Sequence, residues 1–397
     1  MNKIKNRTVT KRHIFGGAFV MGSLSLFYAG ASAVFMPLDY EAMPPEAEIA
    51  ATSTSEVADL PESPPPVLHV KTPDAVKAIY MSSWVAGTPS IRERVIGIVN
   101  HTEVNSLMID IKDYSGRISY EVTDPELVKI GSAEVRVRDM RELLARLHKD
   151  NVYVIGRIAV FEDQYFTKIH PELAVKSKRT GGVWKNRKGL MWLDSGSKEV
   201  WDYIIAIAKD AHKIGFDEIN FDYIRFPTDG DIKDMAFPIS GAKPKPEVIK
   251  EFFAYLDGHM KTAGIITSAD IFGMTTTATD DLNIGQVLEN ALPYFDYIAP
   301  MVYPSHYPGG FNGWANPNAH PYELIKHVMQ SGVDRAIVAS TTPLKLRPWL
   351  QDFSMGAPSY GKKEVEAQIQ ATYDAGLTSW MLWDPSNKYK GGALLKE

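Results

Sequence analysis

The chain has 397 residues, of which 45% are hydrophobic and 11% aromatic, enough for one large globular core or for two ordinary domains. Its formal net charge is -5, and no basic stripe stands out beyond the N-terminus, so the composition does not indicate a nucleic-acid partner. There is no cysteine, which excludes disulfides, thiolate metal sites and a cysteine nucleophile.

The first 38 residues have the order of an export signal. Residues 1–13 carry five lysines and arginines and no acid, and residues 14–38 are uncharged. This length can span a bilayer, which needs about 20 residues. Ala31-Ser32-Ala33 is a possible cleavage site, but the apolar run continues past it. We therefore expect a signal anchor at the outer face of the cytoplasmic membrane, or secretion if the signal is cleaved; a buried soluble helix is the less favoured alternative.

Residues 39–75 are predicted to be a disordered linker. They are rich in proline and acidic residues, and no helical or strand period persists in them. Such a composition gives an extended, poorly packed tether. It would hold a folded domain away from a membrane surface.

From residue 76 to residue 397, short apolar runs alternate with longer amphipathic stretches, which predicts alternating strands and helices of the α/β class. The predicted strands are 76–84, 105–113, 152–161, 216–226, 265–273, 295–303, 335–341 and 377–384. Eight such strands predict a (β/α)8 TIM barrel. An open doubly wound sheet is the alternative, but SSWVAGTPS after the first strand lacks the G-x-G-x-x-G fingerprint.

Acids and aromatics stand at the predicted C-terminal ends of these strands, where the active sites of such barrels lie. The candidate catalytic residues are Asp222, Asp270 and Asp110. Carboxylates held together raise one another's pKa, whereas a nearby arginine, here Arg225, keeps one ionised. One proton donor and one anion are what glycosidic bond cleavage requires. The candidate substrate-binding residues are Arg225, Tyr223, Tyr303, Trp84, His306, Trp383, Asp384 and Lys112.

Each candidate also has a purely structural interpretation. Asp222 could pair with Arg225, Asp270 could cap a helix, and Asp384 could shape a turn before Pro385. Asp110 and Lys112 could belong to a structural ion-pair network, and both tryptophans could be core residues. Asp217 and Glu218, at the base of the fourth strand, fit a stabilising role better than a catalytic one. The functional interpretation depends on the shared position of the other residues at strand ends.

Four segments resemble a bacterial and archaeal family known as "putative glycosyl hydrolase domain". They are LMIDIKDYSG, GFDEINFDYIRFP, APMVYPSHY and MLWDPSNKY, and the resemblance spans roughly residues 76–394. It implies a TIM-barrel fold and hydrolysis of a polysaccharide.

The fourth strand is also similar to the D-x-x-D-x-D-x-E signature of family 18 chitinases. Asp217 and Asp222 match its first and third acids, but Asn220 stands at the second acid and Ile224 at the catalytic glutamate. These departures put a chitinase-type mechanism in doubt.

The layout is similar to that of the alpha-amylase clan, whose nucleophile ends strand four and whose acid ends strand five. This similarity implies Asp222 as nucleophile or base and Asp270 as acid. Independently of it, Asp110 is the substitute candidate for the acid. The clan's arginine precedes its aspartate by two residues, whereas Arg225 follows Asp222 by three.

We therefore expect a glycoside hydrolase of the cell envelope that acts on a polysaccharide or oligosaccharide without a cofactor or metal. A non-catalytic carbohydrate-binding envelope protein is the alternative. A metal-dependent deacetylase fits less well, because the ten histidines are scattered and form no H-x-H or H-x-x-x-H pair at a strand end.

Overall fold

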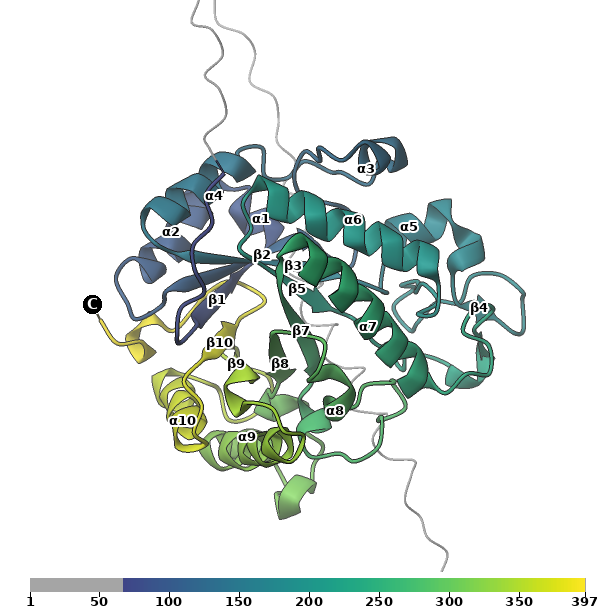
Figure 1. The fold of residues 1–397 in the computed structure, drawn as a ribbon. Helices are drawn as coiled ribbons and strands as arrows, with labels where there is room; N and C mark the ends of the chain where they lie inside the picture. Colours follow the sequence, from purple (N-terminus) through teal and green to yellow (C-terminus); the bar gives the residue numbers. More distant parts are fainter. Residues whose placement is uncertain (1–66, 397) are drawn as a thin grey trace, which may run out of the picture.

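The computed structural model describes residues 67–396, in which eight parallel strands close into a barrel (Figure 1). The order around the barrel is β1, β2, β3, β5, β7, β8, β9 and β10, which pairs with β1 again. The strands are β1 (Lys77–Met81), β2 (Ser106–Lys112), β3 (Tyr153–Ala159), β5 (Glu218–Asp222), β7 (Ile266–Phe272), β8 (Tyr297–Met301), β9 (Trp349–Gln351) and β10 (Trp380–Trp383). The predicted (β/α)8 barrel is confirmed.

Helices surround the strands and lie between them in sequence (Figure 1). The longer ones are α2 (Pro89–Val99), α4 (Met140–Lys149), α6 (Lys198–Ile214), α7 (Lys245–Ala263), α9 (Pro321–Val338) and α10 (Lys362–Asp374). The shorter ones are α1 (Ser83–Ala86), α3 (Pro125–Ile130), α5 (Gln164–Ile169) and α8 (Leu288–Ala291). Glycine ends α7 as the sequence predicts: Gly264 is the C-cap and adopts the left-handed conformation, with φ of 69°, that glycine adopts without a steric penalty.

Two long loops at the C-terminal ends of the strands are joined to each other. The strands β4 (Lys176–Ser177) and β6 (Met235–Ala236) pair antiparallel and connect the loop after β3 to the loop after β5. Both loops rise from strands that carry candidate site residues, so this small sheet fixes their relative position.

The prediction of a seventh strand at residues 335–341 is wrong, because α9 continues through Val338. Its buried residues, among them Val333 and Ala336, continue the three-to-four spacing of the helix, whereas Val338 is 85% exposed. The β-branched residues of this segment suggested a strand, but the helical period decides its structure.

The strand that fills the seventh place is β9. Its apolar run is short and is flanked by Arg347, Pro348 and Gln351, which obscure the strand pattern in the sequence. Trp349, rather than the serine and threonines at 340–342, therefore reaches the interior of the barrel.

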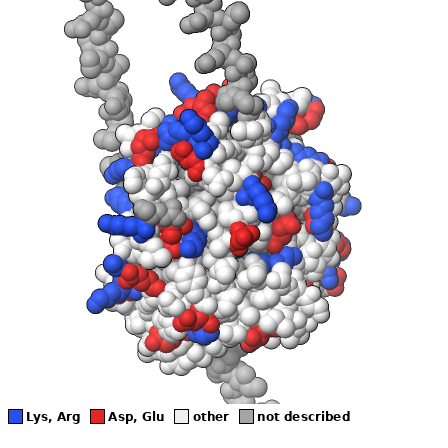
Figure 2. All heavy atoms as spheres, turned by 60° about the vertical axis from the view of Figure 1, so that its left-hand side comes forward, with Lys and Arg blue, Asp and Glu red and all other residues white. Residues whose placement is uncertain are grey.

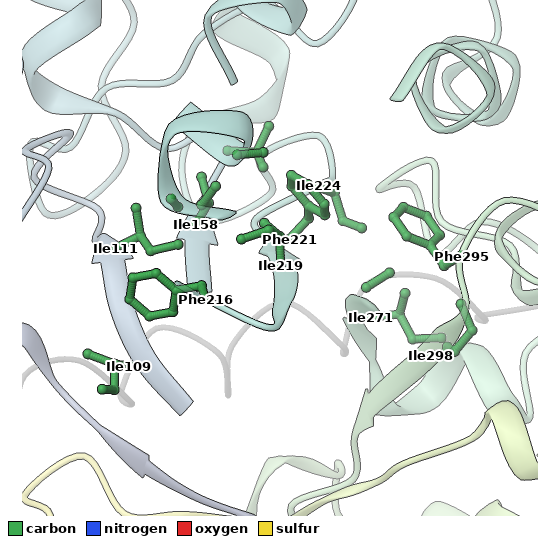
Figure 3. Packing of buried hydrophobic residues seen from close by; sticks show 14 of the residues in the cluster. Ile109, Ile111, Ile158, Phe216, Ile219, Phe221, Ile224, Ile271, Phe295 and Ile298 are labelled. Atoms are coloured by element: carbon green, nitrogen blue, oxygen red, sulfur yellow. The ribbon is translucent and has the colours of Figure 1, made fainter. Parts of the chain in front are cut away.

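Two apolar layers hold the barrel together. The larger cluster joins the outer faces of the strands to the helices, and Figure 3 shows part of it, including Ile109, Ile219 and Ile224. The smaller cluster contains Ala78, Met108, Ile155 and Met381, which alternate with outward residues along their strands and so fill the interior. Ile224, at the position of the chitinase glutamate, belongs to the outer layer.

A buried ion pair closes the base of the barrel. Arg347 Nη1 donates to Glu218 Oε2 at 2.8 Å, and the Tyr153 hydroxyl donates to the same oxygen at 2.9 Å. Asp217 accepts the backbone N–H of Val154 at 2.8 Å. These contacts give the two acids at the start of the fourth strand a structural role.

The described residues begin inside the predicted linker. The backbone N–H of Val70 donates to Asp217 at 2.8 Å, and the Thr72 hydroxyl donates to Tyr153 at 3.1 Å. Residues 67–75 thus lie against the base of the barrel, so this end of the linker prediction is corrected. The predicted signal or anchor (1–38) and the rest of the linker lie outside the described residues. Within residues 67–396, none of the helices has both the length and the apolar character needed to cross a membrane.

Charges of both signs are mixed on the surface. On the face shown in Figure 2, basic and acidic residues are interspersed over α2, α4 and their neighbours. This face therefore lacks the single-sign basic patch that binds a nucleic-acid backbone.

Candidate active site at the barrel mouth

Strand alternation places a set of polar side chains inside the barrel near the C-terminal ends of the strands. Asp110 follows the interior residue Met108 by two positions, and Arg157 follows Ile155 in the same way. The register pairs Asp110 with Arg157 and Arg157 with Asn220, so the three lie at one level. Because side chains two apart share a face, this level is built from the interior positions of three neighbouring strands.

Arg157 lies at the centre of the candidate site and contacts all three predicted catalytic aspartates. Its Nη1 donates to Asp110 Oδ1 at 2.7 Å, while Nε and Nη2 donate to Asp222 Oδ2 at 3.1 and 2.5 Å. Its Nε also lies 3.8 Å from Asp270 Oδ2. The structure therefore brings together the three carboxyls that the sequence singled out.

Asp222 and Asp270 are close enough for the charge of one to affect the ionisation of the other. One oxygen of each lies 3.1 and 3.8 Å from the same Arg157 Nε, so their separation cannot exceed the sum of these distances. Like charges this close disfavour simultaneous ionisation. Burial, and then the charge on Asp222, raise the pKa of Asp270 to about 8. The raised pKa favours the neutral form of Asp270.

Asp270 is also fixed by two neutral donors. Its Oδ1 accepts from Asn220 Nδ2 at 2.9 Å and from Trp349 Nε1 at 2.8 Å. The side chain is 2% exposed, compared with 9% for that of Asp222. Asp222 is thus the more accessible carboxyl of the pair.

Asp110 occupies the other side of Arg157. The Tyr80 hydroxyl donates to its Oδ2 at 2.5 Å. Burial raises the pKa of Asp110, while Arg157 opposes the rise. Its side chain is 4% exposed, so Asp110 also lies deeper than Asp222.

The peptide after Asp222 adopts an unusual conformation. Tyr223 has φ of 54°, in the left-handed region that non-glycine residues rarely occupy, and its N–H donates to Asp222 Oδ1 at 2.6 Å. Both carboxylate oxygens of Asp222 thus have donors, from the backbone on one side and from Arg157 on the other. Strained backbone of this kind is common where a functional side chain must be held in position.

Aromatic rings form one wall of the site. Trp383 stacks on Tyr80 with ring centroids 4.1 Å apart and meets Trp349 edge-on at 5.5 Å. The Arg157 guanidinium lies 5.3 Å from the Trp383 ring. Tyr303 is buried. Its burial and the charges of Asp270 and Asp222 raise the pKa of its hydroxyl, so it lies near both aspartates. Trp383 and Tyr303 therefore lie where the sequence analysis placed them.

Trp84 lies further out, on α1 after β1. It is 57% exposed, and the Arg136 guanidinium covers one region of its ring at 4.4 Å. Arg136 is held by Asp113 at 2.6 Å. An exposed tryptophan whose orientation is fixed by an ion-paired arginine can stack against a flat apolar ligand face.

Arg225 does not pair with Asp222 as expected; the cation that does so is Arg157. The Arg225 guanidinium lies 4.9 Å from the Trp192 ring and 5.2 Å from the Phe272 ring, and its Nη1 donates to the Phe226 carbonyl at 3.2 Å. Arg225 follows Asp222 by three positions, beyond the end of β5, so strand alternation no longer determines where Arg225 points.

Lys112 is directed away from the site. A β-bulge between Asp110 and Lys112 puts Lys112 opposite Ile158, an outward residue of β3. Its ammonium is fully buried and pairs with Asp163 at 2.7 Å. The prediction that Lys112 binds substrate is therefore wrong, and its structural alternative holds.

His306 and Asp384 are engaged within the protein. Burial lowers the pKa of His306 to about 3, so its imidazole is neutral, and its ring lies 4.9 Å from that of Tyr303. Asp384 accepts from the N–H and hydroxyl of Ser386 at 2.7 and 2.6 Å, which is the turn-shaping role. Trp383, next to it, is the residue of this motif that faces the other site residues.

Sequence reasoning did not select Arg157, Tyr80, Asn220, Trp349 or Glu162 as site residues. Strand alternation could have found Tyr80, Arg157 and Asn220, because each is spaced by an even number from another interior position. Glu162 lies beyond β3, where that rule ends. It is buried, and burial, followed by Asp229, raises its pKa to about 8.

No group of three or more potential ligands is arranged to hold a metal ion within residues 67–396. The carboxylates of the site are instead held by arginine and neutral donors. The chemistry that these residues can perform themselves is proton transfer and attack by a carboxylate.

The chain resembles glycoside hydrolases in sequence and in fold. Residues 78–389 match the model of a family described as "Putative glycosyl hydrolase domain". No curated protein matches the chain significantly in sequence. A hypothetical protein from Ruminiclostridium thermocellum is 39% identical in a match that covers 48% of this chain and 96% of that one, with a TM-score of 0.44.

Two solved structures match the fold more completely. The PgaB (BpsB) glycoside hydrolase domain from Bordetella bronchiseptica is 12% identical and has a TM-score of 0.56, covering 80% of this chain and 97% of that one. Alpha-L-fucosidase isoenzyme 2 from Paenibacillus thiaminolyticus is 10% identical and has a TM-score of 0.51, covering 80% and 47%. At these identities the similarity establishes the fold.

Proposed function

Because the chain belongs to the "Putative glycosyl hydrolase domain" family, we propose that it cleaves O-glycosidic bonds in a polysaccharide or oligosaccharide. The observation that carries this proposal is the placement of Asp222 at the mouth of the barrel, where Nε and Nη2 of Arg157 both donate to its Oδ2 and Asp270 lies beside it. Glycosidases need a carboxylate and a separate proton donor, and Asp222 is proposed as the carboxylate.

Asp222 is the proposed nucleophile of a retaining reaction. Its oxygens are fixed by the donors on Arg157 and by the Tyr223 N–H, so the carboxylate is held ready for attack on the anomeric carbon. Asp270 is bound to Asn220 and Trp349, and its raised pKa favours the neutral form, so its proposed role is to limit repulsion beside Asp222.

The proposed substrate lies across the aromatic residues of the mouth. Trp383 and Tyr303 border the three aspartates, and Trp84 provides an exposed ring further out. Aromatic faces with a few placed polar groups are the general pattern of sites for small ligands, sugars included. Export to the cell envelope is a further part of the proposal and is supported by the basic and then apolar order of residues 1–38. A protein lacking residues 1–38 should then remain inside the cell.

The direct test is release of reducing sugar from a panel of purified bacterial, plant and fungal polysaccharides by the wild-type protein and by D222N. We expect activity on at least one polysaccharide and a loss of about 10⁴-fold in D222N, as when a nucleophile is removed. Binding of a polysaccharide by both proteins without release from either would instead establish a carbohydrate-binding protein. The anomeric configuration of the first product, followed by proton NMR, tests retention.

A further inference from the structure

Glu162 is a buried carboxyl on the solvent side of Asp222. The ladder pairs Ala159 with Asp222, and it continues with the N–H of Phe161 donating to the carbonyl of Tyr223 at 3.4 Å. Glu162 follows, and its backbone bridges to Trp192 in the long loop after β3. Since residues further along a parallel strand lie nearer the C-terminal rim, Glu162 lies further out than Asp222.

The carboxyl of Glu162 has an oxygen that accepts no hydrogen bond from the described residues. Glu162 is 3% exposed, and its buried Oε1 has no hydrogen-bond partner among the described residues. The same is true of Oδ1 of Asp229, whose other oxygen accepts from Asn186 at 2.5 Å. A buried carboxylate oxygen without a donor is costly, so such a group either becomes neutral or serves a ligand.

Charged groups reach Glu162 from several loops. Asp229 and Arg225, after β5, act on it in opposite directions: the aspartate favours its neutral form and the arginine favours its anion. Lys188, from the loop after β3, also favours the anion, and Asp222 favours the neutral form.

One further titratable group interacts with Glu162. Tyr114, in the loop after β2, has its hydroxyl pKa raised by burial, by Asp113 and by Glu162. With burial as the largest influence, the balance of all these groups raises the pKa of Glu162 to about 8. A proton donor works best when its pKa lies near the working pH, and this balance meets that requirement.

We propose that Glu162 is the proton donor and acceptor of the glycosidase reaction, acting with Asp222 as nucleophile; this assignment rests on the proposed function. In the first step the proton on Glu162 passes to the glycosidic oxygen as the bond to the anomeric carbon breaks, and Asp222 attacks that carbon to form a glycosyl ester. In the second step Glu162 takes a proton from water, the water oxygen attacks the same carbon, and the ester bond breaks to restore Asp222.

Glu162 suits this role better than Asp270. Asp270 Oδ1 already accepts two hydrogen bonds, and its Oδ2 faces Arg157. By extension of the register, Asp270 lies level with Asp222, whereas Glu162 lies on the side from which a sugar chain reaches the mouth. A proton has to be delivered on that side.

The test compares the wild type with E162Q, D270N and the control E172Q, whose side chain lies exposed on the surface. The probes are 2,4-dinitrophenyl glycosides, whose leaving group needs no proton, and the polysaccharide cleaved by the wild type. For E162Q we expect kcat/KM to fall roughly 10²–10⁴-fold on the polysaccharide but less than about 10-fold on the dinitrophenyl glycoside. On the dinitrophenyl glycoside kcat should fall instead, because the second step has lost its base. D270N should lose activity on both probes alike, and E172Q should lose none.

Two further readouts separate proton transfer from a structural effect. Azide should restore turnover of the dinitrophenyl glycoside by E162Q and yield a glycosyl azide, and the decline of kcat/KM at high pH should disappear in this variant. Equal losses of E162Q on both probes, or no loss, would overturn the assignment of Glu162 while leaving the glycosidase function intact. A wild type that cleaves neither probe would overturn the proposed function and this assignment with it. An infrared difference spectrum of wild type minus E162Q reports independently whether the Glu162 carboxyl is protonated at pH 7.

Discussion

Arg157 and Asp222 are joined through one oxygen: Nε and Nη2 of the arginine both donate to Oδ2 of the aspartate, at 3.1 and 2.5 Å. The same guanidinium reaches Asp110 at 2.7 Å. Burial lowers the pKa of Arg157, but the nearby carboxylates, Asp222, Asp110 and Asp270, raise it. The result is a pKa well above the usual value. The cation is therefore permanent, and the protonation of the carboxyls around it decides the charge of the site.

Replacing Arg157 by glutamine should destabilise the protein in a pH-dependent way. The variant leaves buried carboxyls without their cation, at a cost of about 3–5 kcal/mol near neutral pH. Arg157 lowers the raised pKa values of Asp110 and Asp270, so without it these pKa values would lie further above the unfolded values. The anions then oppose folding, and the deficit should shrink as the pH falls. Urea unfolding at pH 7.5 and pH 5 measures this, and an equal deficit at both values would contradict it.

Wild-type stability should itself decline as the pH rises towards 8. Asp270 and Glu162 each have a pKa of about 8 in the folded protein, well above the usual carboxyl values. A raised folded-state pKa gives stability that is fully present below the unfolded pKa, near 4, and is lost as the pH rises through the folded value. Denaturant midpoints of wild type, D270N and E162Q between pH 4 and 9 test this: each variant should show a shallower decline.

Replacing Trp84 by alanine should weaken substrate binding without disturbing the fold. The ring is 57% exposed, so stability should change by less than about 0.5 kcal/mol. If the ring binds sugar equally in the ground and transition states, KM should rise about 10-fold while kcat stays unchanged. The matched control is V338A, which removes an exposed apolar side chain at the end of α9. A fall in kcat with unchanged KM would show that Trp84 acts in another way.

Removing the ion pair at the base of the barrel should lower stability and leave activity unchanged. E218A leaves Arg347 buried without its partner and should cost about 3–5 kcal/mol in the free energy of unfolding. Because Glu218 starts β5 and Asp222 ends it, kcat/KM of the folded variant should remain within about twofold of wild type. The double variant E218Q/R347M should recover much of the lost stability, since it removes both charges.

Much of the barrel could be predicted from the sequence because its strands are buried on both faces and its helices are strongly periodic. The seventh strand could not be predicted, because the apolar run of β9 is short and follows Arg347 and Pro348. In addition, the β-branched residues at the end of α9 have the composition of a strand. Position at strand ends found Asp110, Asp222 and Asp270, because parallel strands deliver their last residues to one rim.

Contacts beyond the regular strands could not be predicted in this way. A single bulge turned Lys112 outwards, and the end of β5 released Arg225 from the alternation. The partner of Asp222 is contributed by β3, 65 residues earlier in the chain, and only the register of the closed barrel brings the two together. Glu162 lies in a loop whose path depends on its bridge to Trp192. No local sequence pattern predicts that bridge.

The contact between Val70 and Asp217 fixes the start of the described chain at one end of the barrel. The described chain is fastened at the base of the barrel, beside the start of β5, whereas Asp222 stands at the other end of that strand. A tether running from this point to any surface would direct the barrel mouth outwards, away from that surface. Polymers in the space beyond, rather than those lying beneath the domain, would then be the material within reach.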